Sequence, residues 1–183
     1  MGSKGEGFLK RVFLGSTAAD LIRITSKPVL LEKYKELEDE TECKAICERK
    51  FAKILFPTDF SQPAERTFKK IKEFKSITDE IILVHVIDKG VTEEDTALLR
   101  KEAKEKLEIM KKQLDELGIK TEIRIRTGVP SENIIKIAED DAVSLIVIAS
   151  RGEGIIKELL LGSTAENVAR KSTRPVLLFP EKK

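Results

Sequence analysis

Two nearly continuous aliphatic runs, at residues 81–87 and 143–148, constrain the fold of this chain more than any other feature. A strand that is apolar on both sides of its pleat is typical of a parallel sheet covered by helices on both faces. Segments with apolar residues at helical spacing separate these runs from further short strand patterns. The resulting alternation, β-α-β-α-β-α-β-α-β, predicts a doubly wound α/β fold with crossover connections.

The positions of strands and helix ends follow from the same patterns. Ser61 is placed to cap the first helix, and Ser131 to cap a later, shorter one. A long helix ends before Gly118, and Gly162-Ser163 begins the last helix. One strand alternates apolar and charged residues, so we expect it at an edge of the sheet. That strand is the third of those predicted, which lie at residues 52–56, 81–87, 119–126, 143–148 and 175–179.

The two ends of the chain repeat each other without a gap. Residues 2–31 and 149–178 are identical at half of their aligned positions, and both stretches end in Pro-Val-Leu-Leu. We therefore interpret residues 1–32 as the last helix and strand of a first domain, 33–50 as a partly helical linker, and 51–183 as a complete domain. This organisation predicts a truncated tandem protein or a start codon misplaced at Met1.

Charge and composition argue against several classes of protein. The 34 Lys and Arg nearly balance the 32 Asp and Glu, which disfavours a nucleic-acid-binding protein. No apolar run approaches the ~18 residues of a membrane span, and no signal peptide is recognisable, so we expect a cytoplasmic protein without membrane contact. Two cysteines, Cys43 and Cys47, and one histidine, His85, are too few for a disulfide framework or a three-histidine metal site. We expect reduced thiols and a structural histidine.

Two turns that follow predicted strands carry residues suited to ligand binding. Parallel strands end at one edge of the sheet, and ligands bind where the strand order reverses. Pro57-Thr58-Asp59 follows the first strand, and a glycine-containing turn at residues 149–154 follows the fourth. Gly162-Ser163-Thr164 then starts a helix, whose unpaired N–H groups attract phosphates. Asp59 is able to accept hydrogen bonds from a ribose or a base. Gly162-Ser163-Thr164 taken alone is equally consistent with a simple helix cap, and the preceding glycine turn favours the binding site.

The spacing of the glycines after the fourth strand is specific. Gly152, a nine-residue spacer and Gly162-Ser163 resemble the end of the nucleotide-binding signature of the universal stress protein family, Gly-x2-Gly-x9-Gly-Ser/Thr. The first glycine of that signature is Ala149 here. Because alanine adds a methyl group and disfavours positive φ, we expect it to hinder close approach of a ribose or phosphate. Further segments resemble the family's first strand and turn, second strand, third turn and terminal strand, at residues 53–61, 83–86, 128–130 and 175–178.

The resemblance implies a five-stranded parallel, Rossmann-like α/β sandwich with strand order 3-2-1-4-5. It also implies a stress-response protein that binds ATP or AMP, with or without Mg2+. No set of side chains typical of catalysis or of a metal site is evident. Carried over by position, the implied nucleotide-binding residues are Pro57, Thr58, Asp59 and Val86 on the adenosine side, and Ala149, Arg151, Gly152, Gly162, Ser163 and Thr164 around the ribose and phosphates.

Alternatives to a nucleotide-binding regulatory module without substantial turnover stay open. The first is a slow ATPase or nucleotide-dependent enzyme, although the Gly-x4-Gly-Lys-Ser/Thr run of a P-loop is absent. The second is a dimerisation or interaction module that binds no nucleotide. A phosphoacceptor receiver domain would need an aspartate where this chain has Thr127-Gly128.

The terminal strand is the expected contact for a partner. Universal stress proteins resemble one another in pairing their terminal strands antiparallel across a two-fold axis. Here residues 28–31 are able to pair with residues 175–178 of the same chain, which would give an intramolecular pseudo-dimer and cover that sheet edge. The alternative is a homodimer in which the terminal strands of two copies pair.

Overall fold

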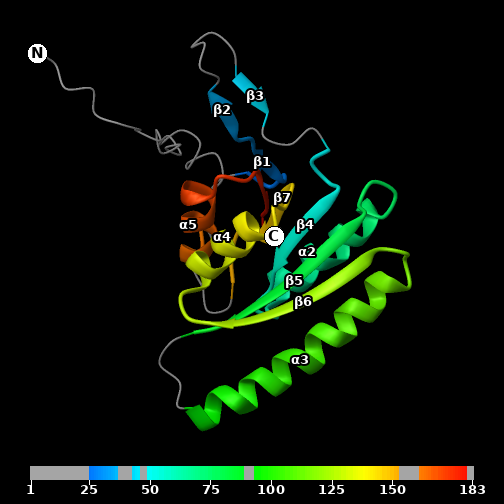
Figure 1. The fold of residues 1–183 in the computed structure, drawn as a ribbon, viewed down its shortest axis with the longest axis vertical. Helices are drawn as coiled ribbons and strands as arrows, with labels where there is room; N and C mark the ends of the chain where they lie inside the picture. Colours follow the sequence, from blue (N-terminus) through cyan, green and yellow to red (C-terminus); the bar gives the residue numbers. More distant parts are fainter. Residues whose placement is uncertain (1–24, 37–42, 46–48, 89–92, 153–160, 181–183) are drawn as a thin grey trace, which may run out of the picture.

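A six-stranded sheet with helices on both faces forms the body of the protein (Figure 1). The computed structural model describes residues 25–36, 43–45, 49–88, 93–152 and 161–180. The sheet runs in the order β1-β8-β7-β4-β5-β6. Its strands are β1 (Val29–Leu31), β4 (Lys53–Pro57), β5 (Glu80–Ile87), β6 (Lys120–Thr127), β7 (Leu145–Ala149) and β8 (Val176–Phe179).

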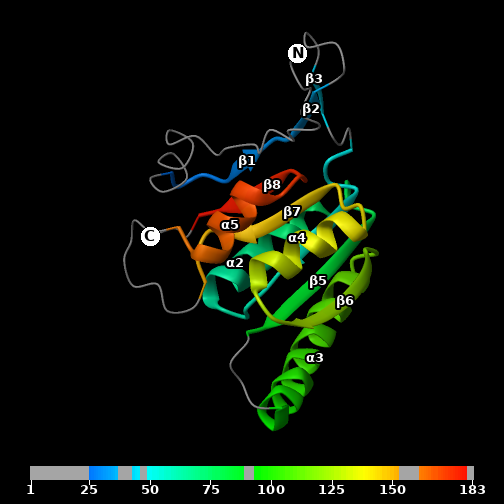
Figure 2. The same ribbon diagram turned by 60° about the vertical axis from the view of Figure 1, so that its left-hand side comes forward.

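Helices cover both faces of this sheet (Figure 2). One face carries α2 and α3, and the other carries α4 and α5. Within the described residues, no helix has the length and apolarity that a membrane span requires. The helices are α2 (Gln62–Ile71), α3 (Glu93–Asp115), α4 (Pro130–Asp140) and α5 (Ser163–Lys171), and the 3-10 helix η1 (Lys72–Phe74) extends α2.

The alternation of side chains along the central strands explains the aliphatic runs. On β4, Leu55 faces the core beneath α4 and α5, whereas Ile54 and Phe56 face the core beneath α2 and α3. On β7, Ile146 and Val147 divide between the same two cores. Both sides of these strands are therefore apolar because both are buried, and the prediction of a sheet covered on both faces is confirmed.

The five strands from β4 to β8 pair in parallel, and β6 lies at an edge as its alternating sequence predicted. β1 adds a sixth strand, antiparallel to β8, with Val29 opposite Leu178. The expected pairing of the N-terminal segment with the terminal strand is thus confirmed within one chain. The expected five-stranded parallel sheet with order 3-2-1-4-5 is corrected to a six-stranded mixed sheet, because that expectation left out the strand that the N-terminal segment contributes.

One of the two predicted helix caps is present in the structure, and the other is not. Ser61 caps α2 as predicted, since its Oγ accepts a hydrogen bond from the N–H of Ala64 at 3.4 Å. The prediction that Ser131 caps α4 is wrong, because the helix begins at Pro130 and follows Val129 without a side-chain cap. A proline at the first helical position has its φ already set, and the N–H that it lacks would have no intrahelical acceptor there.

The segment between β1 and β4 contains a β-hairpin. β2 (Tyr34–Glu36) and β3 (Cys43–Ala45) pair antiparallel, and the hairpin projects beyond the sheet in both ribbon views (Figures 1 and 2). The expected partly helical linker is corrected for these residues, because the chain pairs with itself in extended form. Cys43 therefore lies in a strand, while Cys47 and residues 1–24, which carry most of the N-terminal repeat, lie outside the described residues.

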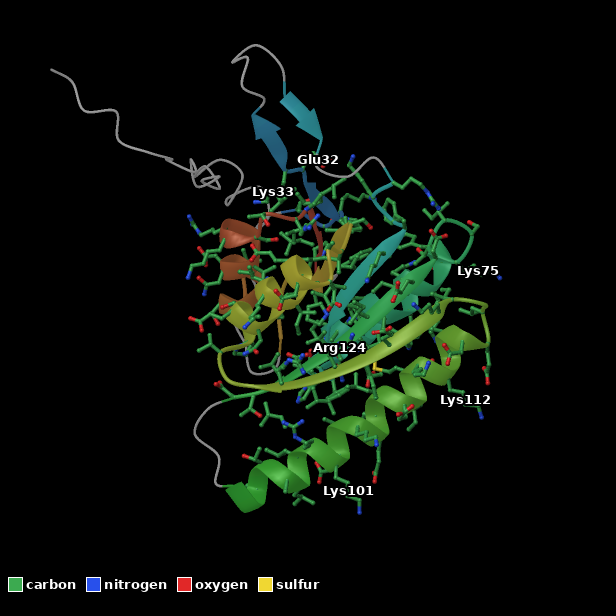
Figure 3. All side chains as sticks on the ribbon, in the orientation of Figure 1. Glu32, Lys33, Lys75, Lys101, Lys112 and Arg124 are labelled. Atoms are coloured by element: carbon green, nitrogen blue, oxygen red, sulfur yellow. The ribbon has the colours of Figure 1, made fainter. Side chains whose placement is uncertain are left out.

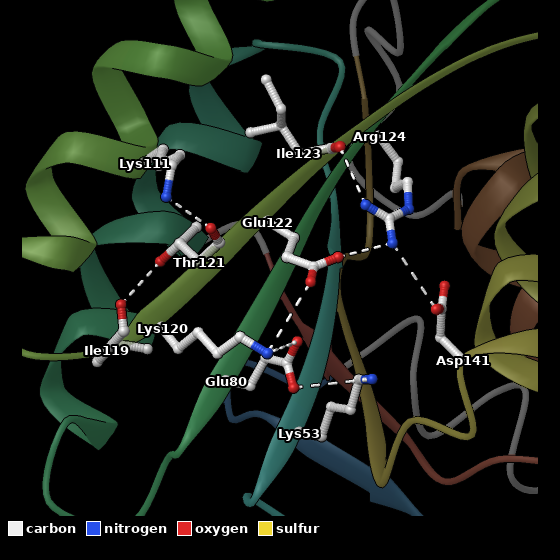
Figure 4. Close-up of polar contacts among 10 residues, drawn as sticks. All are labelled: Lys53, Glu80, Lys111, Ile119, Lys120, Thr121, Glu122, Ile123, Arg124 and Asp141. Atoms are coloured by element: carbon white, nitrogen blue, oxygen red, sulfur yellow. Dashed lines mark hydrogen bonds and ion pairs between the residues drawn. The ribbon is translucent and has the colours of Figure 1, made fainter.

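Charged side chains line the sheet next to its β6 edge (Figure 4). Glu80 of β5 pairs with Lys120 of β6 at 3.2 Å. Arg124 pairs with Glu122 on its own strand at 2.6 Å and with Asp141 at the end of α4 at 3.8 Å. Charges on an edge strand disfavour pairing with a strand of another chain, so this composition protects the β6 edge.

A matched pair of substitutions tests the orientation of α3. Leu107 is fully buried against the sheet, whereas Ile109 is 62% exposed. We expect Leu107→Ala to lower the free energy of unfolding by about 2–5 kcal/mol, because the lost side chain leaves a cavity. Ile109→Ala should change it by less than about 0.5 kcal/mol. Urea unfolding followed by circular dichroism measures both, and equal losses would contradict this orientation.

Candidate functional site

A cleft opens at the carboxyl edge of the sheet, between β4 and β7. β5 and β6 lie on one side of β4, and β7 and β8 on the other, so the strand order reverses there. All five residues of β4 pair with β5, but only Ile54 and Leu55 pair with β7. Beyond Leu55 and Ile146, β4 and β7 therefore no longer pair with each other. A cleft of about 270 Å³ lies between the turns that follow these two strands. Ligands of open α/β sheets bind at such a reversal.

Hydrogen bonds hold the turn after β4. The N–H of Thr58 donates to the carbonyl of Val84 at 2.8 Å, and the N–H of Phe60 donates to Thr58 Oγ1 at 3.0 Å. Asp59 Oδ1 accepts from the N–H and the Oγ of Ser61 at 3.0 and 2.5 Å. Phe60 has a left-handed φ of 62°, which is uncommon for a bulky residue. These contacts fix the carboxylate of Asp59 at the cleft.

His85 supports this turn from the sheet face opposite the cleft. Its Nδ1 donates to the carbonyl of Thr58 at 2.8 Å, and its ring stacks on Phe60 with centroids 4.6 Å apart. Lys106 of α3 places its Nζ 5.0 Å from the centre of the Phe60 ring. Burial lowers the pKa of His85, and the hydrogen bond to Thr58 and the charge of Asp59 only partly oppose it. A neutral, packed histidine behind the turn agrees with the structural role expected for it.

The turn after β7 forms the opposite wall. The N–H of Ser150 donates to the carbonyl of Phe179, and its own carbonyl accepts from the N–H of Gly162, each at 2.8 Å. Ala149, at the first glycine position of the family signature, ends β7 and lines the cleft. It is not among the described residues with positive φ, so alanine at this position does not strain the backbone. What distinguishes alanine from glycine here is one methyl group.

Gly152 brings the two turns together. A Cβ built on Gly152 would overlap Oδ2 of Asp59. Any side chain at position 152 would therefore displace Asp59 or the turn after β7. Glycine here allows the backbone to approach the carboxylate closely.

The start of α5 completes the cleft. Gly162 is the N-cap residue of this helix, and no side chain caps it. The first N–H groups of a helix have no intrahelical acceptor, and Ser163 and Thr164 add hydroxyl groups at the cleft wall. Arg151, which also lines the cleft, adds a positive charge. Together these N–H, hydroxyl and guanidinium donors are suited to bind an anion.

The cleft brings together every residue predicted for the site, and Asp59 and Arg151 are the charged residues among its described lining. Six further lining residues, all apolar, were not predicted from the sequence. These apolar residues follow the helix and strand periodicities of any core, so no pattern separates them from other buried residues. The predicted residues in the lining are Pro57, Thr58, Asp59, Val86, Ala149, Arg151, Gly152, Gly162, Ser163 and Thr164, and the missed ones are Ala64, Val84, Pro130, Ile134, Ile148 and Ala165.

The sheet order and the cleft at its reversal define a Rossmann-like α/β protein. Residues 50–180 match the sequence profile of the universal stress protein family. The chain therefore belongs to the universal stress protein family. The matched residues contain β4 to β8 and the whole cleft, whereas β1 and the β2–β3 hairpin precede them.

Individual relatives agree with this assignment. Universal stress protein MJ0577 of Methanocaldococcus jannaschii is 42% identical over 156 residues, covering 72% of this chain and 96% of the relative. The solved structure of MJ0577 superposes with a TM-score of 0.69 at 44% identity, covering 73% of this chain and 99% of that one. Universal stress protein Slr1230 of Synechocystis is 27% identical over 180 residues, covering 98% of this chain and 56% of the relative.

The single histidine of the chain provides a direct test of the turn. Because burial lowers its folded pKa, His85 should titrate below the usual value of about 6.5 in a histidine NMR titration. The unfolded chain then binds more protons, so the stability due to neutral His85 is complete above about pH 6.5 and decreases as the pH falls toward the folded pKa. A His85→Gln variant should lose less unfolding free energy over that interval. A midpoint at or above the usual value would contradict the packing described for His85.

Proposed function

We propose that the cleft binds an adenine nucleotide, ATP or AMP, and that the protein is a stress-response regulatory module that acts without substantial turnover. The observation that carries this proposal is the close approach of Gly152 to Asp59 across the cleft. A carboxylate acceptor lies against a glycine backbone, and the uncapped start of α5 adjoins both. Nucleosides offer donors to such an acceptor, and phosphates accept from such N–H groups.

The two ends of the cleft would bind different parts of the nucleotide. On the adenosine side, Asp59 and the backbone of Val86 would hold the polar edge, and the apolar lining suits the flat faces of a base. Pro57 and Thr58 would shape this side of the cleft. The residues proposed to surround the ribose and phosphates are Ala149, Arg151, Gly152, Gly162, Ser163 and Thr164.

The composition of the lining supports binding over catalysis. Hydrolysis needs a general base aimed at the attacking water. His85 does not line the cleft, and Asp59 is engaged with Ser61. Mg2+ would accompany the phosphates of ATP. Among the described residues no group of three or more His, Cys, Asp or Glu is placed to hold a metal ion. A slow ATPase is the alternative function.

The N-terminal segment belongs to the same proposal. We interpret residues 1–32 as the last helix and strand of a first domain of this family, residues 33–50 as the linker, and residues 51–183 as the nucleotide-binding domain. The gapless repeat supports this interpretation. The alignment with Slr1230 also supports it, since it covers 98% of this chain and only 56% of that longer relative. The resulting assembly is an intramolecular pseudo-dimer, with a homodimer as the alternative.

Gly152 and Asp59 provide the test of nucleotide binding. We expect calorimetric titration of the purified protein to detect ATP or AMP, and mass spectrometry to identify the adenine nucleotide that it retains. Gly152→Val should weaken binding at least about tenfold, because its side chain displaces Asp59. Asp59→Asn should weaken it by a similar factor through loss of a charged acceptor.

The control is Asp79→Asn. Asp79 precedes β5 at the opposite edge of the sheet and pairs with Arg49, so its removal changes the same charge far from the cleft. Affinity of this variant should equal that of the unaltered protein. If Gly152→Val binds nucleotide as tightly as Asp79→Asn does, the assignment of this cleft is wrong.

Turnover separates the regulatory module from the enzyme. We expect the purified protein to release phosphate from ATP at well below about 1 per second, the lower end of ordinary enzyme rates. A colorimetric phosphate assay with saturating ATP measures this rate. A faster rate that is lost in Gly152→Val would favour the ATPase alternative.

A further inference from the structure

The pairing of β1 with β8 has the register of a two-fold symmetric strand pair. Val29 lies opposite Leu178, Leu30 opposite Leu177, and Leu31 opposite Val176. Residues 28–31 and 175–178 have the same sequence. If the β8 strand of a second copy took the same register, Leu177 of one copy would lie opposite Leu177 of the other. The pair of Val176 with Leu178 would then occur twice, once on each side of the two-fold axis. This is the geometry of an isologous contact, so the chain's own β1 and a second copy compete for one edge.

The apolar contacts of β1 do not decide this competition. Val29 and Leu31 pack against the core that α4, α5 and the sheet enclose. A second copy would present the same valine and leucine from residues 176 and 178. Backbone hydrogen bonds of the ladder are also independent of side chains. Selection between the two strands must come from residues beyond the repeated tetrapeptide.

The sequences diverge directly after that tetrapeptide. Glu32 and Lys33 follow β1, whereas the aligned positions after Leu178 are Phe179 and Pro180. Glu32 forms an ion pair with Lys50 at 3.1 Å. Phenylalanine carries no charge for that pair, and proline has neither an N–H nor a polar side chain.

Lys33 makes the more specific of the two contacts. Its residue is 2% exposed, and its Nζ donates to the carbonyl of Ala169 at 3.0 Å. Figure 3 labels Lys33 on the side of the molecule where α5 lies. Ala169 is in the last turn of α5, where carbonyl groups lack intrahelical donors and the helix dipole is negative. Burial lowers the pKa of this lysine. The hydrogen bond to the Ala169 carbonyl offsets part of the solvation that the buried Nζ loses.

We propose that the β8 edge and the end of α5 form a docking surface that selects the chain's own N-terminal strand over a second copy, and that Lys33 is the residue that confers the selection. The chain's own N-terminal strand places the buried donor of Lys33 at the carbonyl of Ala169. A second copy would place Pro180, which has no donor, at the same position. The amine thus keeps the two-fold surface closed within one chain. This inference does not depend on whether the cleft binds nucleotide.

Lys33→Met in the full chain tests the proposal. Methionine keeps an unbranched apolar stem and removes the donor. We expect hydrogen exchange to accelerate at least about tenfold at those amides of β1 whose N–H groups bond to β8, the effect of one lost charge-assisted hydrogen bond. Sedimentation velocity across a concentration series should show a larger dimer fraction. The matched control is Lys27→Met, which removes the same charge from an exposed position before β1 and should leave both measurements unchanged.

A second variant tests the competing strand in an otherwise unaltered chain. Pro180→Lys gives a second copy the donor that it lacks and should raise the dimer fraction above that of Pro180→Ala, which removes only the proline. If Pro180→Lys and Pro180→Ala dimerise equally, the amine is not the determinant. The proposal is also overturned if Lys33→Met remains as protected in β1 and as monomeric as Lys27→Met.

Discussion

The short pairing between β4 and β7 is the constraint on which the rest of the site depends. These two strands share the centre of the sheet and are buried on both faces, yet their ladder ends at Leu55 and Ile146. Each strand therefore runs on into a turn that no longer pairs with the other. The turns are then held from outside, one by Val84 and His85 and the other by Phe179. A rigid sheet thus presents two ordered turns across an open space, which is what a preformed ligand site requires.

Helix α5 connects the cleft to the surface against which the N-terminal segment packs. Its first residues, Ser163 and Thr164, line the cleft, and its last turn accepts the amine of Lys33 at Ala169. Between these ends Val168 is fully buried against the sheet. An anion at the start and a cation at the end both match the dipole of the helix. The N-terminal segment and the cleft therefore act on one short, tightly packed element.

The sequence predicted the parallel part of the fold because strands that are buried on both faces consist of nearly continuous aliphatic residues. It also predicted the residues of the two turns, because glycine spacing and a helix start are local features. The hairpin of β2 and β3 could not be predicted. Its two short strands pair only with each other, and their sequences carry no clear strand pattern. The start of α4 was misplaced because Pro130 and Ser131 are both acceptable start signals, and the proline prevailed. The apolar lining of the cleft, such as Val84 and Ile148, is indistinguishable from core in sequence, and only the strand-order reversal places it at an open cleft.

The register of β1 on β8 has a consequence for how this surface changes during evolution. In an isologous pair of identical chains every substitution occurs twice, once on each side of the axis, so the two sides cannot diverge. Here the two sides are different stretches of one gene product, residues 28–33 and 175–180. Each is free to mutate alone, and the positions after Leu31 and Leu178 already differ completely while the paired residues are the same. The surface therefore has a distinct donor side, at Lys33, and a distinct acceptor side, at Ala169.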